Sequence, residues 1–217
     1  MIRPKASAFD SMALEYNSWF EDEGKSIFAT EVQALQQILP LLSMPWLEIG
    51  VGSGRFAQAL GISIGLDPSN ELLKIAKSRG VNAFLGRGEA TPFRDSIFGT
   101  AFLIVTLCFV DSPLAVFKEV DRILNNDNGK IVLGLVLREG PWGKFYQHKK
   151  ELGHHLYKHA TFYSFAELEA LLAQVGFSTE TVVSTLFQMP GSVKNIESPQ
   201  QGYSSNAGFT VITARKK

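Results

Sequence analysis

The chain has little of what would mark it as a secreted, membrane-bound or nucleic-acid-binding protein. It contains one cysteine, Cys108, among 217 residues, which excludes an intrachain disulfide and is typical of a reducing compartment. Lysine plus arginine and aspartate plus glutamate both number 21, so the net charge is zero and no basic footprint for nucleic acid is expected. No apolar run reaches the length of a membrane span, and no signal-peptide core is visible. We therefore expect a cytoplasmic protein with neither a membrane nor a nucleic acid as partner.

The residues that are present indicate one α/β domain over residues 1–217. Hydrophobic residues make up 45% of the chain, enough for a sizeable core. Short apolar segments alternate with helical patterns, which predicts βαβ crossovers and a mostly parallel sheet with helices on both faces. The nearly all-apolar segment 131–136 is typical of a parallel strand buried on both faces. Strands are expected at 46–49, 62–66, 81–85, 100–105, 131–136, 177–187 and 209–213.

Helix signals separate these strands. Apolar residues at spacings of three and four predict an amphipathic helix over 28–42. A second helix is expected over 68–79, and a third begins with Pro113 at its first position. Ser164 and Glu167 form a capping-box pattern, which predicts that another helix starts there.

A glycine-rich turn follows the first expected strand, 46–49. Gly50, Gly52 and Gly54 stand at alternate positions, so no side chain fills the inside of the turn. Backbone amides and the start of the next helix can therefore approach a ligand closely. Asp67 ends the next apolar run, where a ribose diol would meet a carboxylate.

Two cofactor classes use such a strand–turn–helix, and a turn with no ligand is the plain alternative. Dinucleotide binders require Gly-x-Gly-x-x-Gly around a pyrophosphate. Here the third glycine, Gly54, comes one residue early, and Arg55 occupies the position that the dinucleotide pattern needs. This difference disfavours a nicotinamide-dependent oxidoreductase.

Two long stretches, 138–163 and 188–208, interrupt the alternation and are expected to be irregular lids or substrate-binding loops. The first is rich in aromatic residues and holds all four histidines. Residues 1–44 are expected to supply an N-terminal cap and helix, with Tyr16 and Trp19 either closing over a ligand or packing the helix on the sheet. Residues 45–137 form the expected cofactor-binding core.

Four segments in register resemble the ubiquinone/menaquinone-biosynthesis-type branch of the class I S-adenosylmethionine-dependent methyltransferases. They are Tyr16-x-x-Trp19-Phe20, the glycine turn with Asp67, residues 88–93 (GEATPF) and residues 108–113 (CFVDSP). The resemblance implies a Rossmann-like, doubly wound sheet of seven strands, the last of them antiparallel. It also implies S-adenosylmethionine as cofactor and a small-molecule methyl acceptor. We expect a monomer or a homodimer.

The resemblance also implies which residues contact the cofactor. They are Tyr16, Trp19, Glu48, Gly50, Gly52, Gly54, Asp67, Pro68, Gly88, Glu89, Thr106 and Leu107. Glu48 and the glycines would hold the methionine end, Asp67 the ribose hydroxyls, and Gly88-Glu89 the adenine edge. The segment 106–108 would lie beside the transferable methyl group. Three residues depart from the family pattern: Arg87, Thr91 and Gly99.

The sequence leaves the catalytic residues open. Methyl transfer from a sulfonium is an in-line displacement, so positioning should supply most of the catalysis and a base is needed only if the acceptor loses a proton. The candidates for such a base are Tyr16, His148, His154 and His155. His155 and His159 at helical spacing would also suit a metal, although surface or packing histidines are the preferred interpretation and no metal is expected. A cofactor-binding protein without turnover remains the non-enzymatic alternative.

Overall fold

The structure, a computed structural model, describes residues 18, 21 and 24–217. The predicted cap residues Tyr16 and Trp19 lie outside these described residues. Among the described residues, no helix combines the length and the apolar character needed to cross a membrane.

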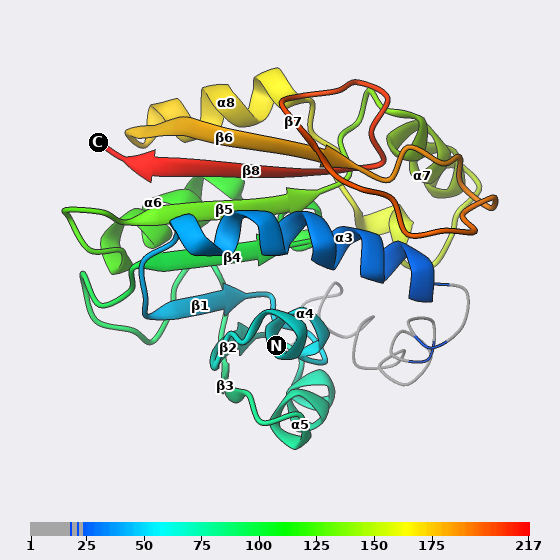
Figure 1. Ribbon diagram of the computed structural model, residues 1–217. Coiled ribbons are helices and arrows are strands. Elements are labelled where there is room, and N and C mark those ends of the chain that lie inside the picture. Colours follow the sequence, from blue (N-terminus) through cyan, green and yellow to red (C-terminus); the bar gives the residue numbers. More distant parts are fainter. Residues whose placement is uncertain (1–17, 19–20, 22–23) are drawn as a thin grey trace.

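One sheet runs through the described part of the chain (Figure 1), in the strand order β3-β2-β1-β4-β5-β8-β6-β7. Strands β1 to β5 pair in parallel, whereas β8 is antiparallel to both of its neighbours. The bounds are β1 (Trp46–Ile49), β2 (Ile64–Asp67), β3 (Asn82–Leu85), β4 (Thr100–Ile104), β5 (Lys130–Leu135), β6 (Phe177–Thr185), β7 (Gln200–Gln201) and β8 (Phe209–Lys216). The predicted mostly parallel sheet with an antiparallel last strand is confirmed.

The strand count differs from the prediction by one. The additional strand, β7, is a two-residue segment within 188–208 that pairs with β6 through Val183 and Ser184. Both of its residues are exposed glutamines, so no apolar alternation marks it in the sequence.

Helices cover both faces of the sheet (Figure 1). On one face α3, α4 and α5 share a core with Phe102 and Val132; on the other α6 and α8 pack on Leu103 and Leu133. The bounds are α3 (Lys25–Ile38), α4 (Arg55–Leu60), α5 (Asn70–Ser78), α6 (Pro113–Ile123), α7 (Pro141–Glu151) and α8 (Phe165–Gln174), with 3-10 turns η1 (Leu39–Leu41), η2 (Leu107–Phe109) and η3 (Tyr157–His159). Helices on both faces of a parallel sheet leave the carboxyl ends of the strands as the edge where loops meet.

The predicted helix starts are confirmed by their caps. The Ser164 hydroxyl accepts from the Glu167 N–H, and the Glu167 carboxylate accepts from the Ser164 N–H, which completes the capping box. Ser112 caps α6 with Pro113 at the first position. The helix predicted over 28–42 ends as α3 at Ile38, because a proline at position 40 lacks the N–H that an α-helix requires.

The prediction that 138–163 is irregular was wrong, because the segment contains α7 and η3. In α7 only Trp142 and Gly143 are buried, so the helix carries no apolar stripe from which it could be predicted. The loop 188–208 is irregular apart from β7 and lies along α3 (Figure 1). The Glu197 N–H donates to Thr30 Oγ1 at 3.3 Å, and Gln201 donates to Gln37 at 3.2 Å.

Candidate functional site

The predicted cofactor residues within the described chain meet at the carboxyl ends of β1 to β4. The glycine turn follows β1, Asp67 ends β2, and Thr106 follows β4. Because these strands are parallel neighbours, their ends form one edge of the sheet. The N–H groups of Gly50 and Val51 both donate to the carbonyl oxygen of Leu66, which fixes the turn beside the end of β2.

The three glycines all have a positive φ, but their surroundings differ. A Cβ on Gly50 would lie 2.3 Å from Thr106 Cγ2, and a Cβ on Gly54 would lie 3.0 Å from the Ala76 Cα. At Gly52, with φ +51°, a Cβ would meet no atom of the described residues within 4 Å. The turn is therefore closed by protein on two sides and open at Gly52, which is the geometry of a backbone cradle for a ligand.

The Asp67 carboxylate fixes the glycine turn through hydrogen bonds. Its Oδ2 accepts from the Gly52 N–H at 2.9 Å, and its Oδ1 accepts from the Ser69 N–H at 2.8 Å. Ser69 also caps α5 by accepting from the Leu72 N–H. These two bonds fix the orientation of the Asp67 carboxylate at the end of β2.

Glu48 is a buried acid directly before the turn. It is 1% exposed, and its Oε2 has no hydrogen-bond partner in the described part of the chain. Burial raises its pKa well above the usual range, the nearby Asp67 charge raises it further, and the Ala57 N–H partly offsets both. Such an acid beside a ligand cradle is a typical functional-site feature.

The backbone is strained immediately before Thr106. Val105 has φ +52°, although a β-branched residue disfavours this region, and its N–H donates to the Gly134 carbonyl oxygen at 2.7 Å. The Thr106 hydroxyl donates to the Ile104 carbonyl oxygen at 3.0 Å and lies 3.3 Å from that of Gly50. Leu107, which follows, is buried in the core, so it faces away from a ligand at this edge.

Glu89 has a role that the sequence did not predict. Its Oε1 accepts from the Asp111 N–H at 2.9 Å, and its Oε2 accepts from Arg87 Nε at 3.3 Å. Arg87 also pairs with the Asp111 carboxylate at 2.6 Å. Arg87 therefore joins the segment after β3 to the segment before α6, which explains one of the three departures. Gly88 lies beside β1, because a Cβ on it would be 2.9 Å from Ile49 Cγ2.

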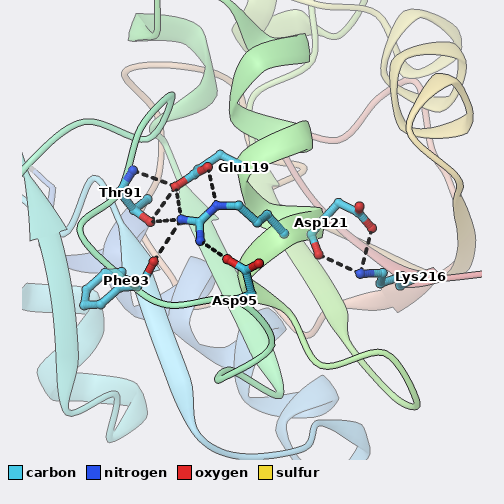
Figure 2. A network of polar contacts seen from close by, with 7 residues as sticks. Thr91, Phe93, Asp95, Glu119, Asp121 and Lys216 are labelled. Carbon is cyan, nitrogen blue, oxygen red and sulfur yellow. Dashed lines mark hydrogen bonds and ion pairs between the residues drawn. The ribbon is translucent and has the colours of Figure 1, made fainter.

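Figure 2 shows the network that contains the second departure, Thr91. Glu119 Oε1 accepts from both the N–H and the hydroxyl of Thr91 at 2.7 Å. Arg122 donates to Glu119, to the Phe93 carbonyl oxygen and to Asp95. A leucine at position 91 could not donate its side chain, so Thr91 fixes the 91–95 segment on α6.

The third departure, Gly99, is explained by close packing. A Cβ at this position would lie 2.3 Å from the Ser43 carbonyl oxygen and 2.6 Å from that of Met44. The Gly99 N–H donates to the Pro45 carbonyl oxygen at 2.9 Å. Gly99 therefore lets the segment before β1 approach the start of β4.

The histidines do not form one cluster. His148 is exposed on α7 and lies 3.7 Å from Glu151, whereas the rings of His154 and His155 stack at 4.5 Å after the helix ends. His159 lies in the 3-10 turn η3, which begins after His155. The two histidines are therefore not one turn apart on an α-helix, as the metal interpretation required. The described residues contain no group of three or more metal-binding side chains.

Sequence reasoning missed Glu31 on α3. This carboxyl group is 7% exposed, and burial raises its pKa to about 8. It stands three residues after Phe28 and four before Leu35, on the apolar stripe used to predict the helix. Its position within an apolar stripe was the feature of the sequence that could have identified Glu31 as a buried acid.

Sequence and structure comparisons agree on a family. A methyltransferase domain model matches residues 47–133. An uncharacterized protein of Mycobacterium tuberculosis is 42% identical over 213 residues, 97% of this chain and 74% of that protein. One of Methanocaldococcus jannaschii is 37% identical over 210 residues, covering 97% and 99% of the two chains.

Among solved structures, a Thermotoga maritima protein described as an S-adenosylmethionine-dependent methyltransferase and possible histamine N-methyltransferase has a TM-score of 0.91. It is 38% identical, with 98% of this chain and 100% of that chain covered. A Streptomyces coelicolor geranyl diphosphate C-methyltransferase, crystallised with S-adenosyl-L-homocysteine, shares the fold at TM-score 0.60 and 16% identity, covering 84% and 78%. The chain therefore belongs to the class I S-adenosylmethionine-dependent methyltransferases, and its cofactor is S-adenosylmethionine, as the resemblance of the four segments implies.

Proposed function

We propose that the protein transfers a methyl group from S-adenosylmethionine to a small molecule. The observation that carries the proposal is the glycine turn, which is closed at Gly50 and Gly54, open at Gly52, and hydrogen-bonded to Asp67. The orphaned Glu48 Oε2 at the same edge also fits a ligand with a cationic end. Within the family, the four matching motifs favour the ubiquinone/menaquinone-biosynthesis-type branch.

The residues at the strand ends would hold the cofactor as follows. The open backbone at Gly52 and the acid Glu48 would receive the methionine end, and the Asp67 carboxylate would accept hydrogen bonds from the ribose hydroxyls. The segment Gly88–Glu89 would lie at the adenine edge, and its position is fixed by the bonds from Arg87 and Asp111 to Glu89.

When bound, S-adenosylmethionine supplies a methyl group on a sulfonium, which an acceptor lone pair attacks in line with the sulfur. The chain's own task is to position the acceptor and to exclude water. Thr106 and η2, fixed by the strained Val105 backbone, would form the boundary between cofactor and acceptor. A base would be required only for an acceptor that must lose a proton.

We infer that a small-molecule acceptor lies under α7, η3 and the loop 188–208. These segments follow the carboxyl ends of β5 and β6, where open α/β sheets bind ligands. Aromatic contacts link Trp142, Tyr146 and Tyr157, which suit the wall of a small-molecule site. The charge balance gives no basic surface for RNA. The name of the Thermotoga maritima relative, with its small amine, is consistent with this inference.

Calorimetry and an acceptor screen test the proposal. We expect binding of S-adenosylmethionine and S-adenosylhomocysteine but not of NAD, and formation of S-adenosylhomocysteine when an acceptor is added. Binding of the cofactor without turnover on any of a broad set of small molecules would favour a non-catalytic binding protein. Preferential methylation of RNA would overturn the small-molecule acceptor.

A further inference from the structure

Glu31 is an internal carboxyl group without a partner among the described residues. The residue is only 7% exposed. Within residues 24–217, its carboxylate forms no hydrogen bond or ion pair. The adjacent Thr30 is engaged, because its hydroxyl accepts from the Glu197 N–H of the loop 188–208. A buried carboxyl that lacks a partner reduces stability, so its presence points to a ligand.

An aromatic cluster lies on α7 and in the segment that follows it. The rings of Tyr146 and Tyr157 have centroids 4.5 Å apart, and Phe162 stacks parallel to Tyr146 at 6.4 Å. The Glu31 charge contributes to raising the pKa of Tyr157, which burial raises to about 12, so the carboxyl and the phenol lie within electrostatic reach. Tyr146 also packs against the apolar core that includes Ala34 and Leu35 of α3.

This group adjoins the methyl-transfer end of the site and not the adenine end. Cys108 in η2 also acts on the pKa of Tyr157, and the Cys108 carbonyl oxygen accepts from the Thr161 N–H at 2.8 Å. Thus η2, which follows β4 and the strained Val105, connects directly to the segment that carries the aromatic rings. Glu31 therefore belongs to the acceptor side.

Three of the cationic or titratable side chains on the neighbouring elements have other contacts. Lys150 donates to the Ala160 carbonyl oxygen at 2.6 Å, and Lys149 lies over the Phe145 ring at 4.7 Å. His154 stacks on Tyr157 at 4.7 Å, and its Nδ1 accepts from the Leu156 N–H. Among the described residues, no lysine, arginine or histidine forms an ion pair with Glu31.

We propose, on the basis of the methyltransferase function above, that the acceptor is a small organic amine whose ammonium group binds between the Glu31 carboxylate and the rings of Tyr146 and Tyr157. A carboxylate supplies the counter-charge, and aromatic faces attract a desolvated cation. A neutral alcohol would gain neither contribution. Because Glu31 is mostly protonated in the free protein at pH 7, binding of an ammonium group releases its proton.

The test uses calorimetry on the protein saturated with S-adenosylhomocysteine. The probes are arylalkyl and alkyl primary amines, 2-phenylethylamine first, each compared with the alcohol of the same skeleton. The variants are Glu31→Gln and, as a control, Glu169→Gln, which changes an exposed glutamate on α8. We expect amines to bind more tightly than their alcohols, with release of about one proton at pH 7 measured in buffers of different ionisation enthalpy. Glu31→Gln should weaken amine binding about 10- to 100-fold and abolish the proton release.

The two proposals fail in different ways. Loss of S-adenosylhomocysteine binding by the parent protein would overturn the proposed function itself. If that ligand binds but no amine exceeds its alcohol, or if Glu31→Gln binds amines as the parent does, the amine site is wrong while the methyltransferase proposal stands. Unchanged S-adenosylhomocysteine affinity in Glu31→Gln shows that the variant is folded.

Discussion

The carboxylate of Asp67 and the N–H of Gly52 are joined by a hydrogen bond of 2.9 Å. The bond links the end of β2 to the one glycine of the turn that faces open space. Asp67 therefore has two functions in the proposed site: it fixes the conformation of the turn, and it would accept hydrogen bonds from a ligand. The cofactor-site predictions depend on separating these two contributions.

Replacing Gly52 by valine should abolish cofactor binding. The new side chain would project into the space that the proposed cofactor occupies, where a Cβ meets no atom of residues 24–217 within 4 Å. The matched control is Gly61→Val, because Gly61 also has a positive φ and open space but lies at the end of α4. Both variants should lose similar stability in denaturant unfolding, and only Gly52→Val should lose S-adenosylhomocysteine binding by calorimetry. Full affinity in Gly52→Val would refute the cradle.

Replacing Asp67 by alanine should weaken cofactor binding by about 1–3 kcal/mol, the usual cost of losing hydrogen bonds to a charged group. Part of this loss comes from the turn, since the bonds to Gly52 and Ser69 disappear. A 2′,3′-dideoxy analogue of the cofactor lacks the ribose hydroxyls, so its loss of affinity for the variant measures the effect of the turn alone. We therefore expect the variant to lose more affinity for the parent cofactor than for the analogue. Equal losses for the two ligands would show that Asp67 does not contact the ribose.

Replacing Glu31 by glutamine should stabilise the protein increasingly as the pH rises. Burial raises the pKa of Glu31 from 4.5 to about 8, so the folded state favours the protonated form. The parent therefore loses stability as the pH rises from 4.5 to 8, by up to a few kcal/mol, whereas glutamine does not ionise. Denaturant unfolding at pH 5 and pH 8 measures the difference, and the exposed control Glu169→Gln should show none. Parallel pH profiles for Glu31→Gln and the parent would contradict the burial of an unpaired carboxyl.

Replacing Glu119 by glutamine should have the opposite pH dependence. Hydrogen bonds from Arg122 and Thr91 lower the pKa of Glu119 to about 2. The stability that ionised Glu119 contributes is therefore fully present above pH 4.5 and is lost as the pH falls toward 2. At pH 7 we expect a loss of about 1–3 kcal/mol in the free energy of unfolding, shrinking in acid. The control is Asp95→Asn, which changes an exposed partner of Arg122 and should cost under about 1 kcal/mol. A penalty for Glu119→Gln that stays constant down to pH 2 would be inconsistent with this network.

The local features of this protein follow from its sequence. Glycines at 50, 52 and 54 adopt the positive φ that the turn needs, and Ser164 with Glu167 forms the predicted capping box. Both are set within a few residues by backbone sterics and short-range hydrogen bonds, which makes them readable without a fold. The parallel direction of the first five strands also follows, because strands that alternate with helices form βαβ crossovers.

Other features depend on contacts between distant segments, so only the tertiary structure decided them. The aromatic helix α7 has no apolar stripe of its own, and the polar strand β7 exists because it pairs with β6. Thr91 and Arg87 gain their roles from partners more than twenty residues away in the chain. Glu31 is an unremarked acid in the helical pattern. Only the tertiary structure buries it, and that loss of solvent, which no local spacing encodes, raises the pKa of its carboxyl group.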